Sequence, residues 1–444
     1  MARLRYGLGA LAIWVCGAAQ AADLMALFGE AERNDPTYLA VKSGLEATRE
    51  LKPQARAQAF LPKVDIQAEM AREFQEITPA ADGGGASFGG GEFEFLSGGY
   101  TLNVTQPVYH HDRYAQLKQA DSRIRASELE LDAALQDLIV RLSERYFDVL
   151  AAADSLEFAQ AEKNALARQL EQTRERFGVG LLPITDVEEA QAGHDLAVAQ
   201  EIEADNLLDN AHEALREIVG RYHTEFSRLR EGIPLLRPAP ADIEVWSRKA
   251  QEQNLALGRA RAEAETARQE IQRQTSGHYP TLDVVGRHGF NTTGGRFGNV
   301  ETDASAIGLQ LTIPVFEGGQ VNSRTREAGH RYTQALQQME AAQRAAHRQA
   351  RESYLGVVAG VSRVQALKQA VVSTRTAVES TSAGFEVGTR TGVDVVAAER
   401  ALSRARRDYA RARYDYVLNG LRLKRAAGTL SVADLKAVNG WLVR

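Results

Sequence analysis

The sequence predicts an α+β fold in which short strands alternate with very long helices, and this plan occurs twice along the chain. Three observations lead to this prediction: an internal repeat, short segments in which apolar and polar residues alternate strictly, and two long stretches without proline. Repeats are considered first because a missed repeat misassigns the whole fold.

Five short motifs of the first half recur in the same order in the second half. The matched residues are 22–24 with 241–243, 61–65 with 279–283, 105–109 with 312–316, 177–180 with 385–388, and 186–187 with 394–395. Five matches in one order indicate a duplicated structural unit rather than chance similarity.

The repeat divides the chain into two parts with the same order of helices and strands, and each part begins with a shorter helix. Residues 22–232 form the first repeat, with strands at about 63–77 and 99–107 and helices at 112–177 and 185–221. A proline-rich linker covers 233–241. Residues 242–428 form the second repeat, with strands at about 281–290 and 304–313 and helices at 319–386 and 393–427. Residues 429–444 form a C-terminal segment.

The predicted strands alternate apolar and polar side chains with a period of two. Val64 and Ile66 alternate with Asp65 and Gln67, and residues 100–105 and 307–313 follow the same pattern. In a single strand, such alternation more often indicates a soluble sheet with one wet face than a wall between lipid and water. The long helices beside these strands favour the second interpretation.

The helices are predicted from the absence of proline, which ends or kinks a helix. No proline lies between Pro107 and Pro183 or beyond Pro314. The first stretch allows a helix of about 65 residues, or roughly 100 Å at about 1.5 Å per residue, whereas globular helices commonly have about 8 to 20. Apolar residues recur at seven-residue steps with one offset of four, which indicates a coiled coil that partly unwinds. They are Leu117, Ile124, Leu131 and Leu138, then Leu135, Leu142, Val149 and Leu156.

The first 21 residues resemble a secretory signal peptide, with Arg3 and Arg5 before an apolar run and Ala19 and Ala21 at a small-residue cleavage site. The single cysteine, Cys16, lies inside this segment, so we expect the mature chain to carry no thiol. No later run reaches the roughly 18 apolar residues of a membrane-spanning helix, so a membrane role would have to come from strands.

Charge and motif content exclude two large classes of function. The 53 basic and 58 acidic residues nearly balance, and no long basic block offers the phosphate-neutralising surface that nucleic-acid binding requires. None of the nine histidines belongs to a metalloprotease-like or triad-like signature. We therefore expect neither an enzyme nor a bound cofactor or metal.

Strand number predicts how several chains would assemble. Four strands cannot close a membrane barrel, because the smallest outer-membrane barrels have about eight and the number is even in bacterial single-chain cases. Two chains would supply eight strands, whose interior is filled by side chains, and three would supply 12, which leaves a pore. We prefer the trimer.

The repeat, the strand pairs and the motif at 387–395 resemble the TolC family of outer-membrane efflux and secretion channels. The likeness covers the mature chain, and it is strongest in the second half, including residues 412–414 and 428–431. It implies a homotrimer with a 12-stranded outer-membrane β-barrel, a long periplasmic α-helical barrel, and an equatorial belt to which residues 429–444 contribute. The implied partners are outer-membrane lipid, a periplasmic adaptor protein, and an inner-membrane pump of the ABC or proton-driven type.

The resemblance also assigns roles to the two turns between the long helices. Both turns would contact the adaptor, through Gly178, Val179, Gly180 and Leu181 in the first and Val387, Gly388 and Thr389 in the second. Asp394 would form an acidic ring in the periplasmic gate, a site that favours cations. The gate would be held by a latch comprising Thr185, Asp186, Phe385 and Arg390, which would tie the tips together within and between copies of the chain.

Two positions depart from the family pattern. Ala397 replaces a second ring aspartate, so we expect a weaker acidic ring. Phe385 replaces a tyrosine whose hydroxyl would join the latch, and phenylalanine cannot make that bond. From spacing alone, helix capping is the favoured role of Thr185, Asp186 and Asp394, because such residues are enriched at helix starts, and capping does not exclude a role in the gate.

The function expected is a passive exit duct of a tripartite efflux pump or a type I secretion system, opened when adaptor and pump dock. The alternative is a soluble periplasmic coiled-coil adaptor or scaffold, which would leave the alternating strands unexplained. Drug efflux and protein secretion use the same fold, so the sequence does not separate them.

Overall fold

The computed structural model describes residues 22–78, 90–294 and 298–443. The predicted signal peptide and residues 79–89, which follow the first predicted strand and are rich in glycine, lie outside this range. The chain forms two compact units, one from residues 1–41, Asp132–Asn254 and Ala345–Arg444, the other from Lys42–Leu131 and Leu255–Arg344. Each unit therefore draws on both sequence repeats.

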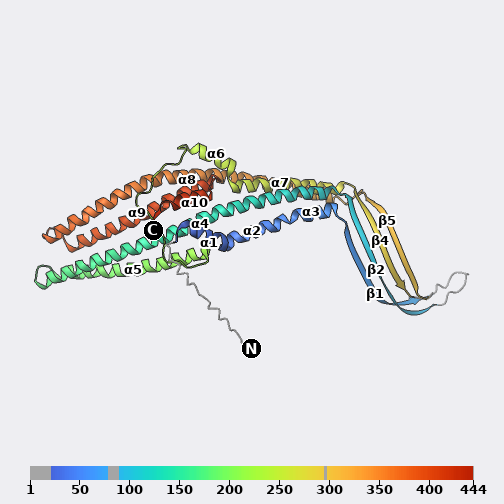
Figure 1. Ribbon diagram of the computed structural model, residues 1–444, viewed down its shortest axis with the longest axis horizontal. Helices are drawn as coiled ribbons and strands as arrows, with labels where there is room; N and C mark the ends of the chain where they lie inside the picture. Colours follow the sequence, from blue (N-terminus) through green and yellow to red (C-terminus); the bar gives the residue numbers. More distant parts are fainter. Residues whose placement is uncertain (1–21, 79–89, 295–297, 444) are drawn as a thin grey trace, which may run out of the picture. The chain divides into compact units, whose positions relative to one another are not determined.

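The first unit consists mainly of helices (Figure 1). It contains α1 (Leu24–Asn34), α5 (Ile184–Val219), α6 (Ile243–Gln253), α9 (Gly392–Ala426) and α10 (Val432–Asn439), with the later parts of α4 (His111–Gly178) and α8 (Gln320–Glu386) and the start of α2 (Pro36–Arg49). Short strands β3 (Arg228–Leu229) and β6 (Leu442–Val443) pair antiparallel.

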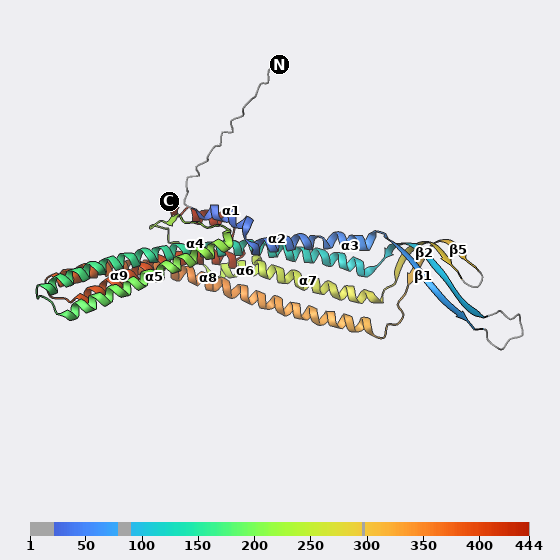
Figure 2. The same cartoon turned by 90° about the horizontal axis from the view of Figure 1, so that it is seen from below.

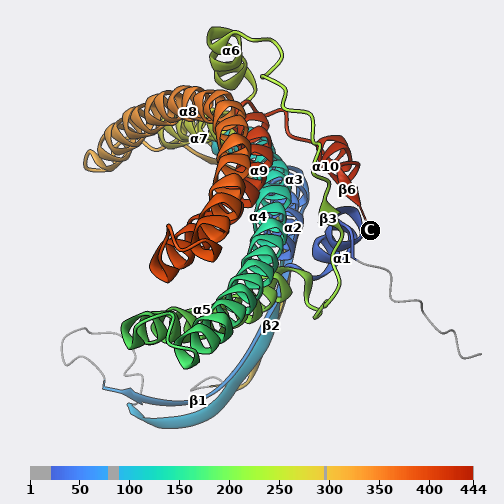
Figure 3. The same cartoon turned by 90° about the vertical axis from the view of Figure 1, so that its left-hand side faces the viewer.

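Two helical hairpins, α4 with α5 and α8 with α9, make up most of this unit (Figures 2 and 3). The hairpins meet where Gly193 of α5 faces Val396 of α9. A Cβ on Gly193 would lie 3.3 Å from the Val396 Cγ1 atom, so the glycine permits this close approach. Leu166, Ala197 and Val396 form a small buried cluster there. None of the eight heptad residues predicted on α4 is exposed, as expected of a coiled-coil seam.

Aromatic side chains form the core of the first unit beside β3. Tyr146 and Phe147 are completely buried, and the rings of Phe147 and Tyr414 stack with centroids 5.4 Å apart. The Tyr146 hydroxyl donates to the Ser227 carbonyl at 2.6 Å, and the Tyr414 hydroxyl donates to Asp154 at 2.6 Å. Burial raises the pKa of both tyrosines, which therefore remain neutral donors.

The second unit combines helices with a four-stranded sheet. Its helices are α3 (Leu51–Phe60), α7 (Leu255–Thr275), the 3₁₀ turn η1 (Ser276–His278), the first parts of α4 and α8, and the end of α2. Its strands are β1 (Lys63–Ile77), β2 (Gly91–Tyr109), β4 (Thr281–Thr293) and β5 (Val300–Thr312). They form an antiparallel sheet in the order β1-β2-β4-β5, which joins the strand pairs of the two repeats (Figure 1).

Successive rows across this sheet differ in polarity, as the alternating sequence requires. Val64, Val104, Gly286 and Ile307 form one apolar row. In the next row, Asn103 donates to Asp65 at 3.2 Å and accepts from the Arg287 Nε atom at 3.3 Å. One face of the sheet is therefore apolar here and the other carries a cross-strand polar network.

The strands are longer than the alternation predicted. β2 begins at Gly91 rather than near residue 99, because residues 91–98 pair with β1 as far as Ile77. The glycines of this segment suggest a loop in sequence, but Gly99 is required inside the sheet, since a Cβ there would lie 2.3 Å from the Phe290 carbonyl oxygen. Likewise, β5 begins at Val300 rather than 304 and β4 extends to Thr293. Within the described ranges, no helix has both the length and the apolar character needed to cross a bilayer.

Candidate functional site: the hairpin tips

The two turns between the long helices, here called the first tip (residues 179–183) and the second tip (387–391), have the same geometry. Gly180 and Gly388 have φ values of 79° and 80°, a left-handed conformation that glycine adopts at little cost. The amide of each glycine donates a hydrogen bond to a carbonyl of the preceding helix. Gly180 donates to the Phe177 carbonyl at 2.8 Å, and Gly388 donates to the Phe385 carbonyl at 3.2 Å. The repeated motif therefore encodes two equivalent helix reversals.

Both tips present apolar side chains to solvent. Val179 and Leu181 of the first tip are each 72% exposed, and Val387 of the second is 76% exposed. Ile184 and Val393, at the starts of α5 and α9, are about half exposed. Apolar side chains gathered at exposed turns are typical of a surface that contacts another protein.

Phe385 is the only member of the predicted latch that is buried, with 3% of its surface exposed. Arg176, at the end of α4, lies over the Phe385 ring at 4.7 Å from the centroid. The same guanidinium donates to the Phe385 carbonyl at 3.1 Å. This cation–π contact with a hydrogen bond ties the ends of the two hairpins together within one chain.

Arg390 lies in the second tip close to Gly384. A Cβ on Gly384 would lie 2.7 Å from the Arg390 Cγ atom, and the Gly384 carbonyl accepts bonds from the Thr389 and Arg390 amides at 2.8 and 3.2 Å. Gly384 therefore lets the turn fold back on α8. Sequence reasoning did not single out Gly384 or Arg176, since both act on residues brought near them by folding.

Asp394 is held in a capping box at the start of α9. Its carboxylate accepts from the Thr391 amide at 3.0 Å and the Thr391 hydroxyl at 3.1 Å, while the Asp394 amide donates to that hydroxyl at 3.3 Å. These bonds from Thr391, with a smaller effect of nearby Arg390, hold the pKa of Asp394 below its usual value. Asp394 is therefore a negatively charged helix cap at neutral pH.

The first tip lacks an equivalent cap. The N-cap position of α5 is Pro183, without a side-chain cap, and the Asp186 amide donates to the Pro183 carbonyl at 3.2 Å. Among the residues that the structure describes, neither the Thr185 nor the Asp186 side chain bonds to Arg390 within the chain. The predicted latch contact between these groups thus remains a prediction about contacts between copies.

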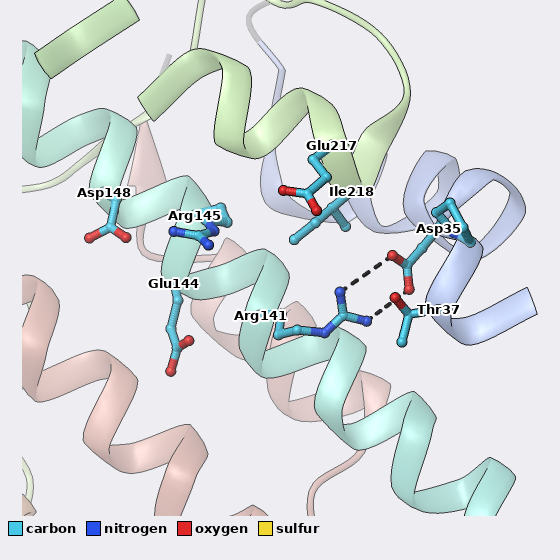
Figure 4. A pocket seen from close by; sticks show the side chains of 9 residues that line it. Asp35, Thr37, Arg141, Glu144, Arg145, Asp148, Glu217 and Ile218 are labelled. Carbon is cyan, nitrogen blue, oxygen red and sulfur yellow. Dashed lines mark hydrogen bonds and ion pairs between the residues drawn. The ribbon is translucent and has the colours of Figure 1, made fainter. Parts of the chain in front are cut away.

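A polar cavity of about 370 Å³ in the same unit is lined by charged side chains, several of which bind one another (Figure 4). Arg141 donates to both carboxylate oxygens of Asp35, at 3.3 and 2.8 Å, and to Asp137 at 2.7 Å. Glu144 and Asp148, which also line the cavity, accept from arginines of α9. These groups join the α1–α2 junction, α4 and α9 to one another, and each of these carboxylates is bound to an arginine.

Comparison with known proteins agrees with this architecture. The model of the family described as "Outer membrane efflux protein" matches residues 27–221 and 246–429. The outer membrane protein TolC of Vibrio cholerae is 36% identical over 95% of this chain and 94% of its own length. The alkaline protease secretion protein AprF of Pseudomonas aeruginosa is 28% identical over 91% of this chain and 84% of its own.

Solved structures share the fold at lower identity. The outer membrane protein VceC of Vibrio cholerae superposes with a TM-score of 0.73 at 20% identity, covering 91% of this chain and 96% of that one. The CmeC outer membrane channel of Campylobacter jejuni gives a TM-score of 0.77 at 16% identity, covering 94% of this chain and 89% of that one. The predicted α+β fold is therefore confirmed, and none of these comparisons favours the soluble adaptor alternative.

The family match covers both repeats and both tips, and the relatives align over nearly the whole chain. The protein is thus a transporter rather than an enzyme, and it belongs to the outer membrane efflux protein family, the TolC-like channels of the outer membrane that serve efflux and type I secretion.

Proposed function

We propose that three copies of this chain form a passive exit duct, with a 12-stranded barrel in the outer membrane and a helical tunnel in the periplasm. The observation that carries this proposal is the open four-stranded sheet. Its edge strands β1 and β5 run antiparallel to each other and have no partner on their outer sides among the described strands. Unpaired edges are costly for a sheet, and closure between copies removes them.

The exposed apolar side chains of the edge strands support a lipid-facing surface. On β1, Ile66, Met70 and Phe74 are 67%, 72% and 75% exposed, and on β5 Ile307 and Leu309 are 84% and 74% exposed. Alternate exposed apolar residues are typical of barrel strands in contact with lipid. Four aromatic residues near the helix-proximal strand ends, Phe60, Tyr109, Tyr279 and Phe316, are 40% to 85% exposed and suit an aromatic girdle at the membrane interface.

The exposed apolar residues of the tips support contact with a periplasmic adaptor protein, through which an inner-membrane pump would deliver cargo. Relatives carry names from both transport classes: AprF and the proteases secretion protein PrtF of Dickeya chrysanthemi, and the cobalt-zinc-cadmium resistance protein CzcC of Cupriavidus metallidurans. We therefore propose a pump of either the ABC or the proton-driven type.

The tips would also form the periplasmic gate. Three copies of Asp394 would make an acidic ring, weakened because Ala397 carries no second carboxylate. The latch would combine the Arg176–Phe385 contact within each chain with contacts of Arg390, Thr185 and Asp186 between chains. An exposed ion pair contributes only about 0.2 to 1 kcal/mol, so three such pairs would hold a gate that a docked partner can open.

The test is single-channel recording of protein purified from outer membranes, in planar lipid bilayers, comparing wild type with Arg390→Ser. Discrete openings with larger conductance in the variant would support the pore and the latch. Equal conductance would retain the duct and refute the role of Arg390. Folded protein without channel activity would refute the duct.

A further inference from the structure

The exposed surface of α9 differs sharply from that of α5, although the two helices pack together. Between its first residue and Arg413, α9 exposes residues only every third or fourth position, which places them in one narrow strip. They are Val393, Ala397, Ala401, Arg404, Asp408 and Arg411. In α5, by contrast, more than half of the residues are exposed, and the exposed arc is broad.

A ring of paired helices leaves least room on its concave side. Helices that line the concave side can expose only a narrow strip of residues to the lumen, and these residues must be small where the walls of the duct converge. Helices on the convex side expose a broad arc of residues to solvent. The α9 strip meets both conditions because Ala397 and Ala401 follow Asp394 towards the middle of the helix. On the proposed trimeric duct, this strip is therefore the part of the hairpins that faces the lumen.

We infer that Arg404 sets the charge selectivity of the periplasmic mouth by offsetting the lumenal carboxylates of Asp394 and Asp408. Three copies would place a ring of guanidinium groups about 15 Å beyond the Asp394 ring, since ten residues of helix rise about 1.5 Å each. This inference rests on the proposed duct. It adds that Arg404 is the residue that weakens the preference of the duct for cations.

The partners of the charged residues on the strip support this role. Arg411 is bound to Asp148 at 2.8 Å and to Asp415 at 3.2 Å, so its charge is largely neutralised. In the part of the chain that the structure describes, Arg404 makes no hydrogen bond or ion pair, and Asp408, one turn further, makes none either. Their charges are therefore available to ions that pass along the strip.

Ala397 and Ala401 separate the charge of Asp394 from the charge of Arg404 along α9. Asp394 is partly exposed at the edge of the strip, and Ala397 and Ala401 add only methyl groups to the strip between it and Arg404. The charged residues in between, Glu399 and Arg400, are only partly exposed and are not among the strip residues. Charges about 15 Å apart are screened at physiological salt, where the screening length is about 8 Å, but not at about 0.01 M, where it is about 30 Å. The opposing effects of the Asp394 and Arg404 rings on ion permeability should accordingly be strongest in dilute salt.

The test measures the reversal potential of single channels in a potassium chloride gradient, for wild type and Arg404→Ala. We expect the ratio of potassium to chloride permeability to rise about two- to tenfold at low salt, because a positive ring is removed. Asp408→Asn, on the same strip, should shift the ratio in the opposite direction. Arg375→Ala, an exposed arginine of α8 at similar depth, is the matched control and should leave the ratio at its wild-type value.

These outcomes separate the inference from the proposed duct. If Arg404→Ala leaves the ratio at its wild-type value in open channels, Arg404 does not face the lumen and the inference is refuted while the duct remains. An equal rise in Arg375→Ala would mean that the effect is not specific to the α9 strip and would likewise refute the inference. If wild-type protein forms no channels, the duct itself is refuted. Alanine is favourable at an exposed helix position, so neither arginine variant should misfold.

Discussion

Among single residues, the contact of Arg176 with Phe385 gives the clearest prediction. A cation–π contact contributes roughly 0.5 to 2 kcal/mol and a hydrogen bond from a charged group about 1.5 to 3 kcal/mol. Arg176→Gln should therefore lower the free energy of opening the second tip by roughly 1 to 3 kcal/mol. Amide hydrogen exchange of residues 384–391 would show this as faster exchange.

The matched control is Arg174→Gln, which removes the same charge from the same helix. Arg174 donates to Gln191 of the adjacent helix α5, and among the described residues it is Arg176, not Arg174, that makes a hydrogen bond and a cation–π contact with Phe385. It should leave exchange in the second tip unchanged. Equal acceleration in both variants would mean that net charge, rather than the Phe385 contact, holds the tip.

At the scale of elements, Glu270 joins α7 to the first part of α4 inside the second unit. Burial alone would raise its pKa, but bonds from Arg273 at 2.6 Å, Gln274 at 2.6 Å and Gln119 at 3.0 Å lower the pKa of Glu270 to about 2. The folded state thus favours the charged carboxylate relative to the unfolded chain, where the value is 4.5. This stabilisation is present above pH 4.5 and is lost as the pH falls towards 2.

Glu270→Gln should therefore destabilise the second unit at pH 7 by roughly 1 to 2 kcal/mol, since one pKa unit corresponds to about 1.4 kcal/mol and solvent screening of this partly exposed group reduces the full value. Thermal melting followed by circular dichroism would show a lower melting temperature at pH 7 and a difference that narrows by pH 3. Glu263→Gln, an exposed residue of the same helix, serves as control. A melting difference independent of pH would rule out this linkage.

The sheet offers a second prediction about elements. Alanine at Gly99 would bring a Cβ within 2.3 Å of the Phe290 carbonyl oxygen, so β2 and β4 would have to separate. Gly99→Ala should cost about 1 to 3 kcal/mol and reduce the yield of folded, heat-modifiable protein on gels. Gly308→Ala is the matched control because no atom lies within 4 Å of its added Cβ. Equal yields would show that the strands can separate at little cost.

For the whole molecule, the proposed trimer predicts that β1 of one copy pairs with β5 of the next. Gln67→Cys combined with single cysteines scanned along β5 should produce covalent trimers on non-reducing gels. Gln67→Cys with Thr101→Cys is the control, since these residues are partners within one chain and should yield only monomers. Monomers in every β5 combination would exclude barrel closure through these edges.

Charge is also segregated between two helices of the first unit, α5 and α9. α5 carries ten acidic residues and one arginine, whereas α9 carries nine basic and four acidic residues. Much of the α9 charge is used against α4, as in the Arg411–Asp148 and Arg422–Glu144 pairs. The acidic face of α5 is therefore left to solvent or to other proteins.

The helices, strands and turns of this protein could be predicted from local sequence patterns, because periodicity, proline-free stretches and glycine turns are properties of neighbouring residues. Alternation in β1 and the heptads of α4 predicted which faces are apolar. Only the tertiary structure showed that Arg176 meets Phe385, 209 positions away, that β2 pairs with β4 across the repeats, and that glycines such as Gly99 belong to a strand. Such contacts depend on which faces meet after folding, and no local pattern encodes that choice.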